Sequence, residues 1–528
     1  MQLRYAFAGL LLATSTLLSS QQVEWLNSAP VDWDLNPDMP THSIRVSRNG
    51  EHVGIVRLTD NVFSFGSDVF ASCMVEAIDP QLGIPIASCP MTDSVQVESM
   101  VVGDNGTIYV AGRFTGDLQF CDGSTISGSD GFLDTDLFLA ALDVDNFGVL
   151  WSRNLSATHA DAQHVPALEI DANGTVWYGC EEFDNVHLVS LDAFGNDVQD
   201  LTINGTRTLG GFSFDPSNNI FVSGSTGLNE GPLEFGGLSV PVNETYMMYV
   251  LRILSDGTGD WARLATDGTF SSPNVVAGGY GEAFVSGALI GSTTWGNIDL
   301  HGPDWVSDVF IVRMDAAGNF DWGKESAPAD GPISGDMRRS AGPSLACDAN
   351  GTVYLTGTIR GQVGWGNGVV SDAITLGAYA QTVVAFANNG TALWEKTTLP
   401  GTINAQNVSC DDEGTVYLCA HANGPYTIGS NTTNNGSPQA FVIGRISGGS
   451  TAITTNGSDA VRAFPSPFNQ SFRVDASPRA QIDVFDAQGQ RVFIGTNPTA
   501  LGADWASGVY AVVVLDGDER SLLRVVKE

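Results

Sequence analysis

Histidines and paired carboxylates are the side chains of this chain whose types could support catalysis or metal binding. His159 and His164 flank Asp161 in one polar segment, a set that could hold a metal or act in acid–base chemistry. The acidic segment 181–184 resembles the paired carboxylates that glycosidases use. Neither set has a diagnostic spacing, and no H-x-H, H-E-x-x-H or nucleophile-elbow motif occurs in a suitable context. We therefore interpret both sets as solvated loops and predict no catalytic residue and no metal ligand.

A recurring aspartate is the second chemical feature of the chain. It stands near the start of similar segments, at Asp104, Asp171, Asp215, Asp348 and Asp411. Such carboxylates could bind calcium, as could the segment 143–148, which has part of a calcium-loop pattern without the distal glutamate. An aspartate before a glycine or asparagine turn also accepts hydrogen bonds from the turn amides. We predict this capping role and no cofactor, with calcium as the alternative.

These aspartates belong to a repeated hairpin. Each copy has an apolar strand, a turn rich in Asp, Asn and Gly, and a returning strand that alternates β-branched and aromatic residues. The copies lie at 104–112, 171–179, 215–224, 279–287, 348–357 and 411–419, with a degenerate copy at 47–56. A second hairpin that ends in Trp follows at 137–151, 249–261, 309–322 and 382–394. The corresponding segment 187–197 lacks the Trp.

Four strands per unit in seven units predict a seven-bladed β-propeller over residues 21–450, in which closure of the ring hides the sheet edges. A linear β-solenoid is the alternative, although its coils are usually shorter. The last unit has no Trp strand, whereas Trp25 precedes the first unit, so we expect the N-terminal strand to complete the last blade. The tryptophans of the second hairpins share one register, which indicates packing residues rather than a sugar-stacking platform.

The two ends of the chain differ in composition from the repeats. Arg4, the apolar stretch 6–18 and a small serine pair have the order of a secretory signal peptide over residues 1–20, the alternative being a buried N-terminal helix. No later apolar run is long enough for a transmembrane helix, so we expect no transmembrane segment in the mature chain. Residues 451–460 are small and polar, as in a linker, and 461–528 has the strand and turn pattern of a small β-sandwich.

The C-terminal module contains an ordered set of short motifs. Their residues are Pro465, Pro467, Phe468, Asp486, Gly489, Gly508, Val509, Tyr510 and Lys527. This order is similar to the type A C-terminal sorting domain of the type IX secretion system of Bacteroidota, with Ser466 in place of the family's asparagine. The resemblance implies export through the type IX secretion machinery, to the medium or the outer cell surface. The repeats resemble the β-propeller repeats of exported bacterial proteins and, more weakly, quinoprotein blades.

Charge and cysteine content bear on partners and cross-links. The chain has 59 acidic and 23 basic residues, a formal charge of −36, so it would repel nucleic acid. An exported chain can form disulfides. A turn centred on Gln81 would place Cys73 opposite Cys89 on neighbouring strands, so we predict a disulfide between these two. The pairing of the remaining cysteines is left open, namely Cys121, Cys180, Cys347, Cys410 and Cys419.

These patterns favour a binding or structural protein over an enzyme. We expect a secreted or surface-displayed propeller with an extracellular glycan or protein ligand, bound at the channel mouth or on the inserts around 225–247, 288–307 and 358–380. An exported polysaccharide hydrolase or lyase with acids at the channel mouth is the alternative. A quinoprotein-like oxidoreductase is less favoured, because adjacent cysteines are absent from the sequence.

Overall fold

The computed structural model describes residues 21–527 except 32–41, 66–67, 130–133, 228–230, 245, 266–271, 303–307, 329–334, 373, 376, 434–438, 448–461, 465–467, 478, 486–490, 497–499 and 517–518. The regular structure of these residues is antiparallel β-sheet apart from the 3-10 turn η1 (Leu155–Ala157), so the chain is all-β as predicted. Within the described ranges, no helix is long and apolar enough to cross a membrane. The expected signal peptide (1–20) and linker (451–460) lie outside the described residues.

The chain forms two compact units, Gln21–Gly448 and a second that contains Gly449–Glu528. The strands of the first unit begin with β2 (His42–Val46), β3 (Val53–Phe65), β4 (Asp68–Ile78) and β5 (Pro85–Val102). The long strand β5 also pairs with the next group, β6 (Thr107–Phe114), β9 (Asp136–Asp143) and β10 (Val149–Asn154), and with the small hairpin β7 (Asp117–Gln119) and β8 (Thr125–Ser127). One strand therefore serves two consecutive groups.

The following sheets are separate. The first has the order β11 (His164–Ile170), β12 (Val176–Glu181), β13 (Asn185–Leu191), β14 (Asp197–Asn204), β17 (Leu233–Phe235) and β18 (Leu238–Val240). The next has β15 (Thr206–Phe214), β16 (Ile220–Thr226), β19 (Met248–Ile253) and β20 (Gly259–Ala265). It is followed by β21 (Asn274–Ala277), β22 (Ala283–Leu289), β25 (Asp308–Met314) and β26 (Phe320–Glu325), with the hairpin β23 (Ser292–Trp295) and β24 (Ile298–His301).

The remaining sheets of this unit lead back to the N-terminal strand. They contain β28 (Asp336–Arg339), β29 (Leu345–Cys347), β30 (Val353–Arg360), β33 (Ala380–Phe386) and β34 (Ala392–Thr397), beside β27 (Ala327–Pro328), β31 (Val363–Gly366) and β32 (Val369–Val370). The last sheet has the order β35 (Thr402–Cys410), β36 (Val416–Asn423), β39 (Gln439–Ser447) and β1 (Gln22–Val31), with the hairpin β37 (Tyr426–Ile428) and β38 (Asn431–Thr433) nearby in the sequence.

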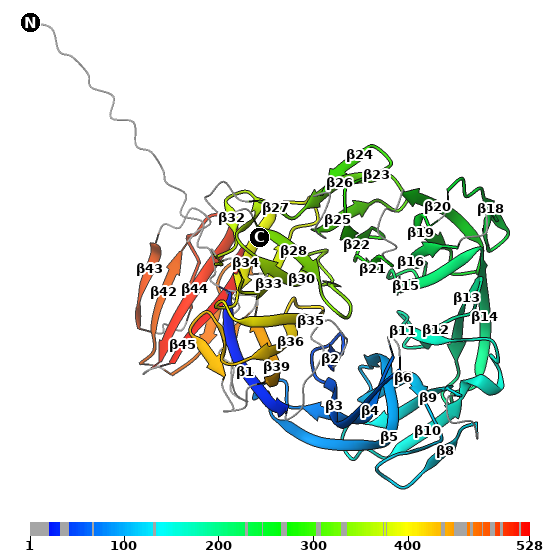
Figure 1. The fold of residues 1–528 in the computed structure, drawn as a ribbon. Coiled ribbons are helices and arrows are strands. Elements are labelled where there is room, and N and C mark those ends of the chain that lie inside the picture. The colour runs from blue at the N-terminus through cyan, green and yellow to red at the C-terminus, as the bar shows by residue number, and fades with distance from the viewer. Residues whose placement is uncertain are drawn as a thin grey trace, which may run out of the picture. The chain divides into compact units, whose positions relative to one another are not determined.

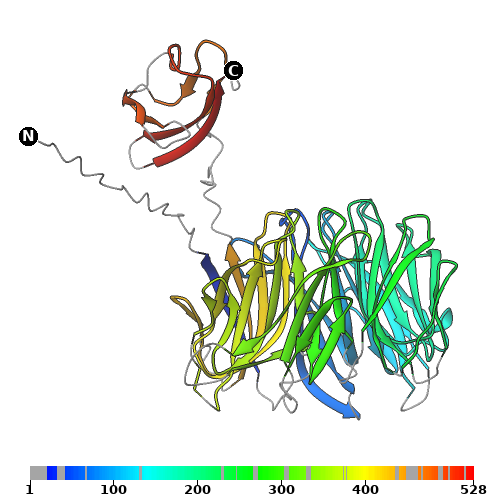
Figure 2. The same cartoon turned by 90° about the horizontal axis from the view of Figure 1, so that it is seen from above.

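The sheets of this unit follow one another around a ring, with β11 and β21 toward its centre and β14 and β24 at its outside (Figure 1). Their strands run along the axis of the ring, from one face to the other (Figure 2). The ring is joined by β1, which pairs with β39 from Gln22 opposite Ser447 to Val31 opposite Gln439. The strand that carries Trp25 thus completes the sheet formed by the last repeat, as the sequence predicted.

Four of the five repeated aspartates cap the turns of the first hairpins, as predicted. The prediction was wrong for Asp104, whose carboxylate accepts a hydrogen bond from the Asn49 amide at 3.0 Å, while the turn amide of Thr107 donates to the Asn105 side chain. In Asp171, one carboxylate oxygen accepts hydrogen bonds from the amides of Asn173 and Thr175, at 2.8 and 2.9 Å. Equivalent pairs of amide hydrogen bonds are made by Asp215, Asp348 and Asp411. Satisfying turn amides in this way explains why an aspartate recurs at this position in four of the hairpins. Among the described residues, no group of three or more His, Cys, Asp or Glu is arranged to hold a metal ion.

The predicted disulfide was wrong. Cys89 is bonded to Cys121, and Cys73 is a free, buried thiol. The expected geometry assumed a turn centred on Gln81. The turn is instead centred between Gln81 and Leu82, with Ile78 opposite Pro85, and a bulge beside it shifts the register further, so that Cys73 faces Met91 rather than Cys89. Because disulfide formation depends on close Cβ positions, this shift is sufficient to prevent the predicted pairing.

The second unit has a small core of its own. Its sheets are the pair β40 (Arg462–Phe464) and β41 (Arg473–Asp475), and a group in the order β43 (Arg491–Thr496), β42 (Gln481–Phe485), β44 (Gly508–Asp516) and β45 (Glu519–Lys527). Their inward side chains include Phe468, Phe472, Ile482, Val512 and Val525, all at most 2% exposed. The composition change after residue 460 therefore does mark a separate β-unit.

Candidate binding site

Tryptophans on the outermost strands join neighbouring sheets of the ring at several seams. Each indole lies against a glycine in the second-hairpin turn of the next sheet, so closely that a Cβ on that glycine would clash with the ring. The pairs are Trp25 with Gly83, Trp151 with Gly195, Trp261 with Gly318, and Trp322 with Gly390. The indole Nε1 of Trp25, Trp261 and Trp322 also donates to a carbonyl oxygen of the same turn, at 2.9–3.0 Å. This confirms that the repeated Trp is a packing residue.

The β13–β14 hairpin has a different residue at the place of this Trp. In the β9–β10 hairpin, Trp151 pairs with Ala141 directly after a β-bulge. At the same point of the β13–β14 hairpin, also directly after a bulge, Gln199 pairs with Ser190. A flexible amide therefore occupies the position from which an indole would reach the next sheet.

The neighbouring sheet has kept the glycine that would receive the indole. Gly257, in the β19–β20 turn, has a φ of +86°, close to the +79° of Gly195 and the +76° of Gly318. The side-chain atoms nearest to its Cβ position belong to Leu201 and Gln199, at 3.3 and 3.5 Å, and not to an aromatic ring. The seam between the sheets β11–β14 and β15–β20 therefore lacks the Trp side chain that fills the seams described above, although Gly257 leaves room for one.

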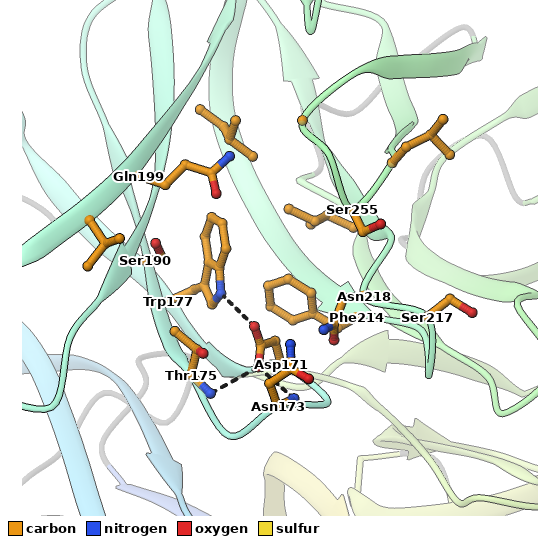
Figure 3. Close-up of a pocket in the computed structure, with 15 residues that line it drawn as sticks. Asp171, Asn173, Thr175, Trp177, Ser190, Gln199, Phe214, Ser217, Asn218 and Ser255 are labelled. Carbon is orange, nitrogen blue, oxygen red and sulfur yellow. Dashed lines mark hydrogen bonds between the residues drawn. The ribbon is translucent and has the colours of Figure 1, made fainter.

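A pocket of about 480 Å³ lies at this seam (Figure 3). Its volume falls in the range of roughly 300–1,000 Å³ that is usual for small-molecule sites. Its polar lining consists of Asp171, Asn173, Thr175, Ser190, Gln199, Ser217, Asn218 and Ser255. Its apolar lining consists of Trp177, Val198, Leu201, Phe214, Ile220 and Leu254, together with the backbone of Gly257. The lining residues come from three hairpin turns and from strands of both sheets, so we name it the seam pocket.

The only ionisable side chain among the lining residues, Asp171, is already engaged within the protein. One of its carboxylate oxygens accepts the two turn amides described above, and the other accepts the indole Nε1 of Trp177 at 3.3 Å (Figure 3). The Trp177 ring in turn packs on Phe214, with 5.5 Å between ring centroids. These contacts hold the floor of the pocket in place and leave the carboxylate with a structural role.

Other polar groups of the seam pocket have unused hydrogen-bonding capacity. Ser190 is only 3% exposed, and its side chain forms no hydrogen bond with another described residue. The side-chain amide of Gln199 and the hydroxyl of Ser255 likewise have no partner in the part of the chain that the structure describes. Since buried polar groups are normally paired, the Ser190 hydroxyl is suited to bind a ligand or ordered water, and the exposed side chains of Gln199 and Ser255 offer further donors and acceptors at the pocket opening.

The histidines and acids singled out in the sequence do not form one site. His164 Nδ1 lies 2.8 Å from Glu98 Oε1, and this hydrogen bond raises the pKa of the imidazole. His159 Nε2 instead lies 3.0 Å from the Tyr178 hydroxyl, and burial lowers its pKa. His159 lies in the loop before β11, as predicted. The prediction was wrong for His164, which is the first residue of β11 and contacts a side chain of another strand.

The acidic segment 181–184 is divided in the same way. Glu181 ends β12 and accepts a hydrogen bond from the Leu209 amide, and burial raises the pKa of its carboxyl to about 7. Glu182 lies 3.5 Å from His187 Nε2. The two carboxylates have different neighbours, the Leu209 amide and the His187 ring, so they do not act as a pair. Glu181 is not the solvated turn residue that we predicted.

Several residues of the expected sorting motif meet in the core of the second unit. Lys527 Nζ donates to the carbonyl oxygens of Gly502 and Ala503, at 2.7 and 2.9 Å, and lies 5.8 Å from the centre of the Phe468 ring. The Tyr510 hydroxyl donates to the Ala506 carbonyl oxygen at 2.6 Å.

The remaining motif positions are only partly described. Gly508 and Val509 begin β44, opposite the end of β45. Pro465, Pro467, Asp486 and Gly489 lie outside the described residues. Of the motif residues whose side chains are described, Phe468, Tyr510 and Lys527 contribute to the core of the unit.

Comparison with known proteins gives no family for this chain. No protein-family model and no curated protein matches it. Among solved structures it is similar to a prolyl endopeptidase from a study of two such enzymes, at 12% identity and a TM-score of 0.36, over 91% of this chain and 55% of that one. It is also similar to regucalcin, a calcium-binding protein of Agrobacterium tumefaciens, at 11% identity and a TM-score of 0.29, over 80% of this chain and 95% of that one.

A third similar structure is dipeptidyl peptidase 4 of Porphyromonas gingivalis, at 10% identity and a TM-score of 0.34, over 92% of this chain and 67% of that one. This chain thus spans little more than half of the prolyl endopeptidase. At these identities and TM-scores, neither peptidase activity nor calcium binding is transferred to it.

Proposed function

We propose that this chain is a secreted or surface-displayed binding protein that holds its ligand without transforming it. The observation that carries the proposal is the seam pocket, whose lining offers unpaired hydroxyl and amide groups. Its single carboxylate, that of Asp171, already accepts three hydrogen bonds. Glycoside hydrolysis uses two cooperating carboxyl groups, so this lining suits binding better than catalysis.

The scaffold in this proposal is a seven-bladed β-propeller. Seven successive groups of strands support it: β2–β5, β5–β10, β11–β14, β15–β20, β21–β26, β28–β34, and β35–β39 with β1. The antiparallel pairing of β1 with β39 supports closure of the ring by the N-terminal strand. A closed ring gives rigid seams, and a rigid seam loses little conformational entropy when it binds a ligand.

The partner for export in this proposal is the type IX secretion machinery, which would recognise the second unit as a type A sorting domain. Support comes from the sequence order of the motifs and from the common core of Phe468, Tyr510 and Lys527. In a Bacteroidota host with this secretion system, the full chain is expected at the cell surface or in the medium. A chain without residues 461–528 is expected to stay in the periplasm, and equal export of both would refute this part of the proposal.

The binding function is tested with the purified chain and a panel of glycans, peptides and chromogenic glycosides. Saturable binding to at least one ligand class, with no release of product, is expected. Release of reducing ends or of the chromophore would contradict the proposal and favour an exported hydrolase or lyase. Loss of that activity on substitution of two carboxylates would then locate the catalytic acids.

A further inference from the structure

We infer that the seam pocket binds one neutral sugar residue, an inference that rests on the proposed binding function. The pocket is open because Gln199 stands where other hairpins have Trp, while Gly257 still has the backbone conformation that receives an indole.

The free polar groups of the seam pocket are of the types that bind sugar hydroxyls. Ser190 is buried, unpaired and directed into the pocket, and the Gln199 amide faces the same space (Figure 3). A hydroxyl and an amide can each donate and accept hydrogen bonds. Sugar hydroxyls also donate and accept, so neighbouring hydroxyls on one ring can satisfy both side chains at once. A purely apolar ligand would leave the Ser190 hydroxyl buried without a partner, which weakens binding.

The apolar part of the lining suits the C–H face of a sugar ring. Val198 is 68% exposed although it is a large aliphatic residue on β14, and it lines the pocket beside Leu201 and Leu254. A pyranose ring has a face of C–H groups, with hydroxyls around its edge. That face can cover the aliphatic side chains while the edge reaches Ser190 and Gln199. Small-molecule sites commonly combine an apolar wall with a few polar groups in this way.

The charge of the lining decides between neutral and anionic sugars. The lining contains no Lys, Arg or His among the described residues, and its only ionisable side chain is the carboxylate of Asp171. The chain as a whole has a formal charge of −36. Uronic acids, sulfated sugars and phosphates need a positive partner to offset desolvation, and the surrounding field repels them. The structure therefore favours a neutral sugar over an anionic one.

The test is calorimetric titration of the full chain with the methyl glycosides of glucose, galactose, mannose and N-acetylglucosamine. The anionic probe is the methyl glycoside of galacturonic acid, whose carboxylate is free. Three variants are compared. Gln199→Trp supplies the indole that Gly257 can receive and fills the pocket, whereas Ser190→Ala removes only the buried hydroxyl. Gln119→Trp is the matched control, because Gln119 is an exposed strand residue outside the pocket.

We expect at least one neutral glycoside to bind and the galacturonic acid glycoside to bind at least about tenfold more weakly, a difference of about 1.4 kcal/mol. Gln199→Trp should weaken the neutral glycoside by more than about tenfold, and Ser190→Ala by about 2- to 10-fold, the range for one hydrogen bond. Gln119→Trp should bind like the unsubstituted chain. Circular dichroism and thermal midpoints check that each variant is folded.

The alternative outcomes separate the two proposals. Neutral glycosides that bind equally well to the Gln199→Trp variant would overturn the pocket assignment and leave the binding function standing. The galacturonic acid glycoside, or a peptide from the wider panel, could instead bind more tightly than every neutral glycoside and lose its binding in the Gln199→Trp variant. That result would overturn the assignment of a neutral sugar and keep the assignment of the pocket. Failure of every glycan and peptide in both panels to bind would count against the binding function itself, and with it the inference.

Discussion

The exchange of Trp and Gln between two seams tests the packing argument most directly. Trp261 fills the seam with the next sheet, is 7% exposed, and donates from Nε1 to the Ala316 carbonyl oxygen at 3.0 Å. A buried Trp covers about 150–250 Å², which at ~25 cal/mol per Å² corresponds to about 4–6 kcal/mol. Gln retains part of that area, so we expect Trp261→Gln to lower the free energy of unfolding by about 2–4 kcal/mol.

The reverse substitution should have the opposite sign. Gln199→Trp buries new apolar area against Gly257 and loses little, because the Gln199 side chain has no partner in the described protein. After the entropy of ordering one side chain, we expect a change between zero and about 2 kcal/mol of stabilisation. Both variants are compared with the unsubstituted chain by urea unfolding, followed by circular dichroism and by Trp fluorescence. Equal losses of stability in the two variants would refute the account of the seam as a vacant Trp position.

Three further predictions concern other parts of the chain. Replacing Cys89 and Cys121 by Ser removes a disulfide with a sequence separation of 32, and should lower the free energy of unfolding by about 3–4 kcal/mol. Cys73→Ser should leave this disulfide intact, as checked by mass spectrometry under non-reducing conditions. Burial raises the pKa of Glu395 to about 7, so the folded state binds this proton more tightly than the unfolded state. The folded state therefore loses stability as pH rises from about 4.3 through about 7. In thermal melts, Glu395→Gln should gain stability relative to the unsubstituted chain between pH 5 and pH 8, and a pH-independent difference would contradict this prediction. Lys527→Met removes two hydrogen bonds to carbonyl oxygens in the core of the second unit and should make that unit more sensitive to limited proteolysis, with unchanged resistance as the contrary result.

Much of the ring could be predicted from local sequence patterns. The Asp-x-Asn-Gly turns and alternating strands predict hairpins because the turn amides and the strand faces are satisfied within a few residues. Trp25 could be assigned to the last sheet because it supplies the strand that the last repeat lacks, and β1 does pair with β39. Each of these inferences depends on one repeat or on the comparison of two repeats.

The disulfide and the polar clusters could not be predicted in the same way. The bulge beside the β4–β5 turn shifts the register, and nothing in the residue types around Gln81 signals it. The partner of Cys89 comes from a later segment, at a sequence separation of 32. The neighbours of His159 and His164 are likewise set by different strands, because Tyr178 and Glu98 belong to β12 and β5.

The seam pocket did leave a signal in the sequence. The segment 187–197 is not followed by the Trp that closes the other second hairpins. Its meaning could not be read from the segment alone, because the pocket also requires Gly257 and the turns of the neighbouring sheet. We expected the ligand at the channel mouth or on the inserts around 225–247, 288–307 and 358–380, but the described residues of these inserts contribute nothing to the lining of the seam pocket.

A crystal structure of the full chain soaked with a neutral glycoside that binds in solution is the most direct test of the central claim. The account predicts one sugar ring in the seam pocket, with hydroxyls in hydrogen-bonding distance of Ser190 and Gln199 and its C–H face against Val198. A sugar located at the centre of the ring or on the inserts, with the seam pocket holding only water, would contradict it.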